Sequence, residues 1–139
     1  MATKRLNRKR AGPKPPQRIR SGDRIWVRCH QIWNILAGHA VYVRKTMEYG
    51  KLARRMGYSP NAGITLAYHL GVVGEYCKLG NLPCLNAIVV NKETGEPGGG
   101  VVTRRGKTWQ DEVREVLRFD WYSVRVPTPG TFRRMKESL

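Results

Sequence analysis

The stretch Glu48–Lys78, EYGKLARRMGYSPNAGITLAYHLGVVGEYCK, predicts two helices joined by a tight turn. The first helix is expected near 48–56, capped by Thr46, and Gly57 stands where the end of a helix favours a left-handed residue. The second is expected over 62–78, where apolar residues recur at helical spacing. The inner face of that helix would consist of Leu66, Leu70, Val73 and Cys77. Two helices joined in this way form the helix-turn-helix layout.

The sequence before and after this pair predicts further short elements. A first helix is expected to run to about Leu36, ended by Gly38, with a β-prone stretch at 39–43. Downstream, Ala87–Val90 is a short β-prone run, and a glycine-rich, turn-rich segment follows as far as Gly100. These elements flank the helix pair on both sides.

The C-terminal third predicts one more helix, over Trp109–Phe119, with Thr108 as its cap and Val116 facing inward. The segment Trp121–Val126 alternates weakly, as a strand does. The residues Trp26, Trp33, Trp109 and Trp121 all fall in predicted elements, so we expect them in the core. The expected fold class is mainly α with small β (α+β), organised as a winged helix-turn-helix-like domain.

The charge of the chain indicates its kind of partner. Its 139 residues include 26 Lys plus Arg against 10 Asp plus Glu, a formal net charge of +16. Such a charge repels itself unless a polyanion neutralises it, so we expect a nucleic-acid partner. No apolar run approaches the length of a membrane span, so no membrane partner is expected. We expect a cytoplasmic protein, associated with the nucleoid or held in a nucleoprotein complex.

Half of the net charge, +8, lies in residues 1–20, which contain no acid. This segment resembles an Arg-rich transit peptide in composition, but its three prolines argue against an amphipathic targeting helix. Too few of its side chains are apolar for it to fold alone, so we expect a disordered basic arm over 1–21 that orders on phosphate. A nucleic-acid-binding domain over 22–126 and a basic C-terminal tail over 127–139 would follow. The candidate contacts in the arm are Arg5, Arg8, Lys9 and Arg10.

Cations within the domain gather around the first helix of the pair and in the glycine-rich loop. Lys51, Arg54 and Arg55 are three and four residues apart, so they share one helix face. Glycines in the loop allow main-chain N–H groups to approach a phosphate backbone closely. A nucleotide-binding P-loop is not expected, because Val101 stands where that motif needs glycine. The candidate phosphate contacts are Arg44, Lys45, Lys51, Arg54, Arg55, Arg104, Arg105 and Lys107.

Cysteine and histidine spacing predicts neither a disulfide framework nor a metal site. The three cysteines, Cys29, Cys77 and Cys84, are an odd number without a close pair, which is typical of a reducing compartment. No Cys/His spacing matches a zinc site. We expect no metal and no cofactor.

Several motifs resemble the DNA-binding domain of O6-alkylguanine-DNA alkyltransferases and their alkyltransferase-like relatives. Glu48-Tyr49-Gly50-Lys51-Leu52-Ala53 resembles the family's Thr-Tyr-Gly-x-Ile-Ala, and Gly57-Tyr58-Ser59-Pro60-Asn61-Ala62 resembles its Gly-x-Pro-x-Ala turn. Gly80-Asn81-Leu82-Pro83-Cys84, followed by Val89-Val90, resembles the hinge and the Pro-Cys-His-Arg-Val-Val motif. The glycines from Gly95 to Gly100 match the family's downstream loop. The resemblance covers roughly half of the chain.

The resemblance implies a winged helix-turn-helix that enters the minor groove. Tyr49 matches the tyrosine that rotates a target nucleotide, and Ile64 falls where the family has an arginine finger. Asn61 lies in the turn between them and is a further candidate for a groove contact. Leu85 replaces the histidine that activates the nucleophilic cysteine, so Cys84 is only a weak catalytic candidate.

These observations favour a non-catalytic protein that grips double-stranded DNA through its phosphates. An RNA-binding or ribonucleoprotein component suits a basic arm and a small domain equally well, and this alternative includes an accessory protein of a phage, plasmid or defence complex. In a third interpretation the chain is an alkyltransferase-type repair or lesion-sensing protein that uses Cys84.

Overall fold

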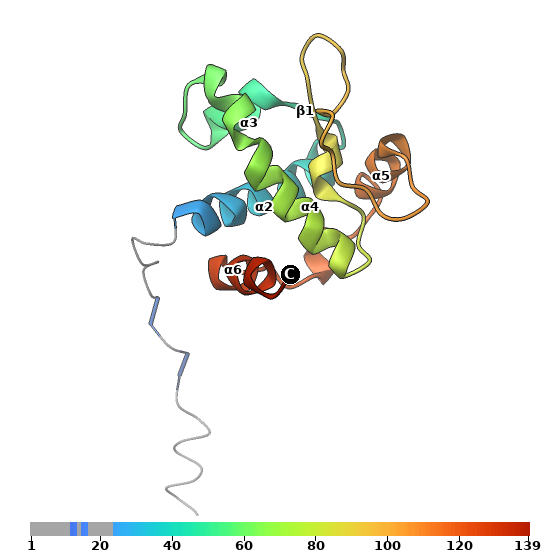
Figure 1. Cartoon of the computed structure of the whole chain (residues 1–139). Helices are drawn as coiled ribbons and strands as arrows, with labels where there is room; N and C mark the ends of the chain where they lie inside the picture. The colour runs from blue at the N-terminus through green and yellow to red at the C-terminus, as the bar shows by residue number, and fades with distance from the viewer. Residues whose placement is uncertain (1–11, 14, 17–23) are drawn as a thin grey trace, which may run out of the picture.

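The computed structural model describes residues 12–13, 15–16 and 24–139, and it is mainly helical with one small sheet (Figure 1). The arm residues Arg5, Arg8, Lys9 and Arg10 lie outside the described residues. The α-helices are α2 (Arg24–Tyr42), α3 (Tyr49–Arg55), α4 (Ala67–Leu79), α5 (Trp109–Val116) and α6 (Pro129–Ser138). Three 3-10 helices are η2 (Pro60–Leu66), η3 (Leu85–Ile88) and η4 (Trp121–Ser123).

The sheet consists of two short parallel strands, β1 (Met47–Glu48) and β2 (Val89–Val90). Met47 is opposite Val89 and Glu48 is opposite Val90. The pairing holds the start of α3 beside the end of η3. The mainly helical α+β class predicted from the sequence is therefore confirmed.

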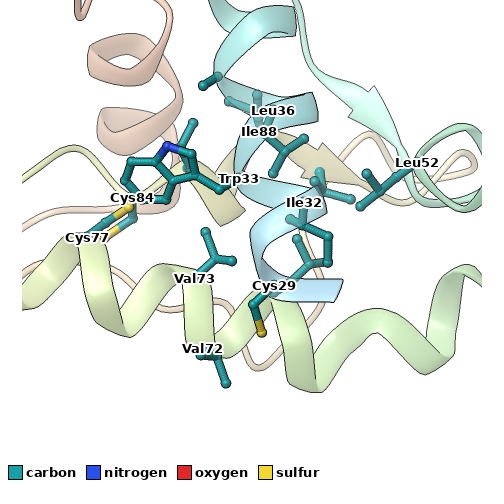
Figure 2. Packing of buried hydrophobic residues seen from close by; sticks show 14 of the residues in the cluster. Cys29, Ile32, Trp33, Leu36, Leu52, Val72, Val73, Cys77, Cys84 and Ile88 are labelled. Carbon is teal, nitrogen blue, oxygen red and sulfur yellow. The ribbon is translucent and has the colours of Figure 1, made fainter. Parts of the chain in front are cut away.

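The core forms around α2, which packs against α4, α6, η3 and η4. Trp33 of α2 is 1% exposed and meets Trp121 edge-on at 5.6 Å and Tyr76 at 5.8 Å between ring centroids. Figure 2 shows Ile32 and Trp33 of α2 lying across from Val73 of α4. Edge-on aromatic pairs add about 0.5–1.5 kcal/mol each beyond the area they bury.

The predicted helix pair is present, but its second helix begins differently. Pro60–Leu66 is a 3-10 helix, and the α-helix starts at Ala67 rather than at Ala62. The tight turn rests on Gly63, because a Cβ there would lie 2.9 Å from the main chain of Tyr49. The predicted inner face is confirmed, since its four side chains are all buried: Leu66, Leu70, Val73 and Cys77.

One predicted helix end is wrong and another is confirmed. α2 continues through Gly38 to Tyr42, so the β-prone stretch at 39–43 is helical over most of its length. Ala37 and Ala40 bury on this extra turn, and this burial outweighs the roughly 1 kcal/mol that a mid-helix glycine costs. Gly57 adopts the expected left-handed conformation, with φ +88°.

The predicted cap of α3 is also wrong. Thr46 precedes β1, and Glu48 occupies the N-cap position of α3 without a side-chain hydrogen bond to the helix. Pairing with β2 positions the chain entering α3, so the helix start does not depend on a capping hydroxyl.

The chain beyond α5 differs most from the prediction. Thr108 caps α5 with a capping box, as expected, but Trp121–Val126 is not a strand: it begins with the 3-10 helix η4 and continues as irregular chain. The segment 127–139, expected as a basic tail, contains α6, which begins with Pro129 and buries Phe132 and Met135. Of the four tryptophans, Trp33 and Trp121 are in the core and the other two are half-buried. Within the described residues, no helix is both long enough and apolar enough to cross a membrane.

Because α6 completes the core, replacing Phe132 should destabilise the whole fold. Phe132 is fully buried and packs against Tyr76 at 5.4 Å between ring centroids. We expect Phe132→Ala to lower the free energy of unfolding by about 3–5 kcal/mol in a urea titration. The exposed Arg134→Ala on the same helix should change it by less than about 0.5 kcal/mol. Equal, small effects of both variants would show that α6 is not part of the cooperative unit.

Candidate nucleic-acid interface

α3 presents a basic face to solvent. Leu52 and Ala53 are fully buried and dock the helix, which leaves Lys51, Arg54 and Arg55 exposed on its outer side. Together with Arg44 and Lys45, also exposed, these residues form what we call the basic face. The structure thus exposes all five cations that the sequence places on this helix and just before it.

No member of the basic face forms an ion pair with an acid in the part of the chain that the structure describes. Five acids of the described residues pair with cations elsewhere: Asp111, Glu112, Glu115, Glu75 and Glu137. The charges of the basic face also act on the buried His39. The pKa of the His39 imidazole is lowered mainly by burial, and the charges of Lys51 and Arg55 lower it further.

A groove of about 600 Å³ runs beside the basic face, between α3, η2 and the loop after β2. Lys51, Arg54 and Lys92 line it, together with the predicted turn residue Asn61. Glu48 and Glu93 also line it, so the groove is not uniformly basic. The side chain of Ile64 lies outside what the structure describes.

The glycine-rich loop carries less available positive charge than its sequence indicates. The guanidinium of Arg104 donates to Glu112 at 2.7 and 3.0 Å and to Glu115 at 2.9 Å. Lys107 lies 3.0 Å from Glu115, and only Arg105 of the three loop cations has no acid partner among the described residues. Arg104 therefore anchors the loop to α5, and its side chain is not available to a phosphate.

Glu112 is the buried partner in this anchor. Burial by itself raises the pKa of its carboxyl, but hydrogen bonds from Arg104 and Cys84 outweigh burial and lower it. The carboxylate also accepts the main-chain N–H of Arg104 at 2.8 Å. A fully buried charge with this many donors is stabilised in its ionised form.

A separate cavity of about 180 Å³ opens between α3, α4 and the glycine-rich loop. Tyr49 and the backbone of Gly98–Gly100 form one side, and the Asn86 side chain lies at its inner end. Asn86 is only 5% exposed, and its Oδ1 has no hydrogen-bond partner within the described part of the molecule. The cavity holds more than ten times the 10–15 Å³ that one water needs.

Two neighbours fix the polar groups of this cavity. The hydroxyl oxygen of Tyr49 accepts the main-chain N–H of Gly98 at 3.2 Å, so the tyrosine ties α3 to the loop. Gly74 lies under Asn86, since a Cβ there would come within 2.5 Å of its Oδ1. The cavity is therefore lined by a phenol whose proton has no acceptor among the described residues and by the Asn86 side chain, whose Oδ1 is buried over Gly74.

Cys84 does not line this cavity. Its side chain is fully buried and its thiol lies 3.8 Å from the Gly74 carbonyl. Burial raises its pKa strongly, and the neighbouring Glu112 carboxylate raises it further. The thiol is therefore held protonated, which is the opposite of what an activated nucleophile needs. No group of histidine, cysteine and carboxylate side chains that could hold a metal occurs in the described part of the chain.

Comparison of the chain with protein-family models, with curated proteins and with solved structures finds no match. The resemblance to alkyltransferases therefore rests only on the short motifs quoted above.

Sequence reasoning did not single out Asn86, Glu112 or Lys92. Asn86 stands three residues before the Val89-Val90 pair, where the motif comparison places the family's arginine, and it was not taken as a site residue. Glu112 belongs to the acidic first turn of α5, eight residues after Arg104, and this proximity of opposite charges was the available signal. Nothing in the local sequence indicates that Asn86 is buried without a partner.

Removing the buried charge of Glu112 should destabilise the protein in a pH-dependent way. We expect Glu112→Gln to lower the free energy of unfolding at neutral pH by about 3 kcal/mol, because Arg104 loses its buried partner. Since the folded-state pKa of Glu112 is lowered, its contribution is present above the ordinary carboxyl pKa and is lost as the pH falls through the folded-state value.

Urea unfolding of both proteins between pH 7 and about pH 3 measures this contribution. The gap between wild type and Glu112→Gln should shrink toward acid pH. Glu93→Gln, an exposed acid without an ion pair in the described residues, is the control and should change little. A gap that is constant with pH would contradict an ionised Glu112.

Proposed function

We propose that this protein is a non-catalytic nucleic-acid-binding protein that grips double-stranded DNA through its phosphates. The observation that carries the proposal is the basic face: five exposed cations, three of them on α3, with no acid paired to them in the described residues. Repulsion between like charges at spacings of three and four residues costs a few tenths of a kcal/mol per pair. A polyanion removes this cost, whereas a solvated surface does not.

In this proposal the helix pair α3 and α4 acts as a helix-turn-helix and the glycine-rich loop acts as the wing. The groove beside α3 supplies Lys51, Arg54 and Lys92 for one stretch of phosphates. Arg105 and main-chain N–H groups of the loop would contact another, and the basic arm would add further charge. Arg104 is left out of the contact surface because Glu112 and Glu115 hold its guanidinium.

The same surface suits structured RNA, so a ribonucleoprotein component is the alternative. Phosphate contacts alone do not distinguish the two polymers. A direct competition between duplex DNA, structured RNA and single strands at about 150 mM salt separates them. Preference for RNA would replace the DNA proposal and retain the basic face.

Reversing charge on the basic face should weaken binding more than reversing the same charge elsewhere. We expect Lys51→Glu combined with Arg54→Glu to lower duplex affinity at least tenfold at about 150 mM salt and to make the salt slope shallower by about 2. Lys78→Glu combined with Arg134→Glu changes net charge equally at two exposed sites and is the matched control.

Fluorescence anisotropy over a salt series gives both quantities. The wild-type slope of log K against log salt should be steeper than about −3 if the arm and the basic face act together. Equal losses in the two double variants would mean that only net charge matters, and the assignment to α3 would be wrong.

A second candidate function rests on the cavity beside Tyr49. The buried Asn86 carbonyl has no partner in the described residues, and leaving such an acceptor unpaired costs about 1–3 kcal/mol unless a ligand or water donates to it. Following the alkyltransferase resemblance, we propose that the cavity receives a base turned out of the duplex. This gives a lesion-sensing protein in which Asn86, rather than Cys84, meets the base.

Asn86→Leu tests this second candidate because it removes the acceptor and keeps the number and branching of the side-chain heavy atoms. We expect the variant to gain about 1 kcal/mol in stability and to lose any preference for duplex carrying O6-methylguanine over plain duplex. A wild type without such a preference would reject lesion sensing and leave the backbone-gripping function. A methyl adduct on Cys84, detected by intact mass, would instead restore the alkyltransferase interpretation.

A further inference from the structure

Two tyrosines form an exposed aromatic pair outside the surfaces described so far. Tyr42, the last residue of α2, is 76% exposed, and Tyr122 in η4 is 63% exposed. Their ring centroids lie 6.0 Å apart, with the planes inclined at 53°. The neighbouring Tyr42 hydroxyl is the main cause that raises the pKa of Tyr122. We call these two residues the tyrosine pair.

Rigid supports hold each ring out in solvent. Trp121, next to Tyr122, is buried against Trp33, and its indole N–H donates to the Val116 carbonyl at 2.9 Å. Asp120 fixes the same turn, because its carboxylate accepts the Tyr122 main-chain N–H at 3.2 Å. Rings held in this way lose little conformational freedom when a ligand stacks on them.

The end of α2 fixes the other ring. The main-chain N–H groups of Val43 and Arg44 both donate to the His39 carbonyl, at 2.9 and 3.0 Å. Arg44 has φ +59°, a left-handed conformation that ends the helix directly after Tyr42, and its Nε donates to the Val41 carbonyl at 3.2 Å. Tyr42 is therefore held at a closed helix end rather than on a free loop.

Cations surround the tyrosine pair. Arg44 and Lys45 follow Tyr42 by two and three residues, so the Cα of Arg44 lies at most about 7 Å from that of Tyr42. Arg125 follows Tyr122 by three residues and is exposed. The neighbouring acid, Asp120, directs its carboxylate to the main chain of the turn. Proteins bind single-stranded nucleic acids with aromatic rings flanked by positive charge, and the tyrosine pair has the same combination of groups.

A hollow of about 270 Å³ lies between the residue that follows Tyr42 and the basic face. Val43, adjacent to Tyr42, lines one side of the hollow, and Arg55 of α3 lines it as well. Neither tyrosine lines the hollow, but Val43 directly follows Tyr42 in the chain, so the tyrosine pair stands near the side of the hollow that Val43 lines. A strand leaving a duplex on α3 would meet the tyrosine pair.

We propose that the tyrosine pair is a stacking platform for unpaired bases, and that the partner is a nucleic acid with a duplex adjoining a single strand. The inference rests on the proposed function, since α3 holds the duplex part. Unpaired bases expose their faces and stack on tyrosine, whereas bases inside a duplex do not. Arg44, Lys45 and Arg125 neutralise the phosphates of the unpaired strand.

The test compares the full-length protein on a blunt duplex and on the same duplex with a 5′ or 3′ overhang of about six nucleotides. We expect the wild type to bind one overhang substrate at least about fivefold more tightly than the blunt duplex. Tyr42→Ala combined with Tyr122→Ala should abolish that advantage and leave blunt-duplex affinity unchanged. Both positions are exposed, so the thermal unfolding temperature should stay close to that of the wild type.

Two control variants sharpen the outcome. Tyr42→Phe combined with Tyr122→Phe keeps both rings and should keep the overhang advantage. Tyr68→Ala removes another exposed tyrosine, on α4, and should also keep it. If the alanine double variant keeps the overhang advantage, or if the wild type shows none, the stacking platform is overturned. Binding to the blunt duplex in the same experiment would still support the proposed function. Absence of binding to every substrate would reject both.

Discussion

The burial of Trp33 is the interaction on which the rest of the molecule depends. Its ring joins α2 to η4 through Trp121, to α4 through Tyr76 and to α6 through Phe132, so segments from four parts of the chain meet on one side chain. With the core closed in this way, α3 needs to bury only Leu52 and Ala53. Lys51, Arg54 and Arg55 face solvent, so the same division that stabilises the domain exposes the cations of α3.

The features that the sequence predicted correctly are local ones. The apolar face from Leu66 to Cys77, the left-handed Gly57 and the Thr108 cap each follow from residues a few positions apart, where helix periodicity and capping chemistry operate. The predictions that failed concern elements that depend on tertiary packing. Gly38 does not end α2 because its neighbours bury against the core, and α6 was missed because Phe132 and Met135 are only two apolar residues in a basic segment.

The candidate site likewise has features that the local sequence predicts and features that depend on tertiary packing. Exposure of Lys51, Arg54 and Arg55 on one helix face could be predicted from their spacing, because that face is set by helix geometry. The sequence could not predict that an internal ion pair holds Arg104, since that pair requires a buried carboxylate on another element. Nor could it predict the cavity at Asn86, because both its burial and its unpaired oxygen depend on how η3 packs against α4.

The short pairing of β1 with β2 also has a consequence for how the chain folds. Met47 and Val89 are 42 residues apart in the sequence, so their pairing closes a loop that contains α3, η2 and α4. Closing a long loop costs chain entropy before any contact compensates for it. Contacts between α3 and η2, which follow each other directly, form early, and the two-residue sheet forms late as the clasp that closes the domain.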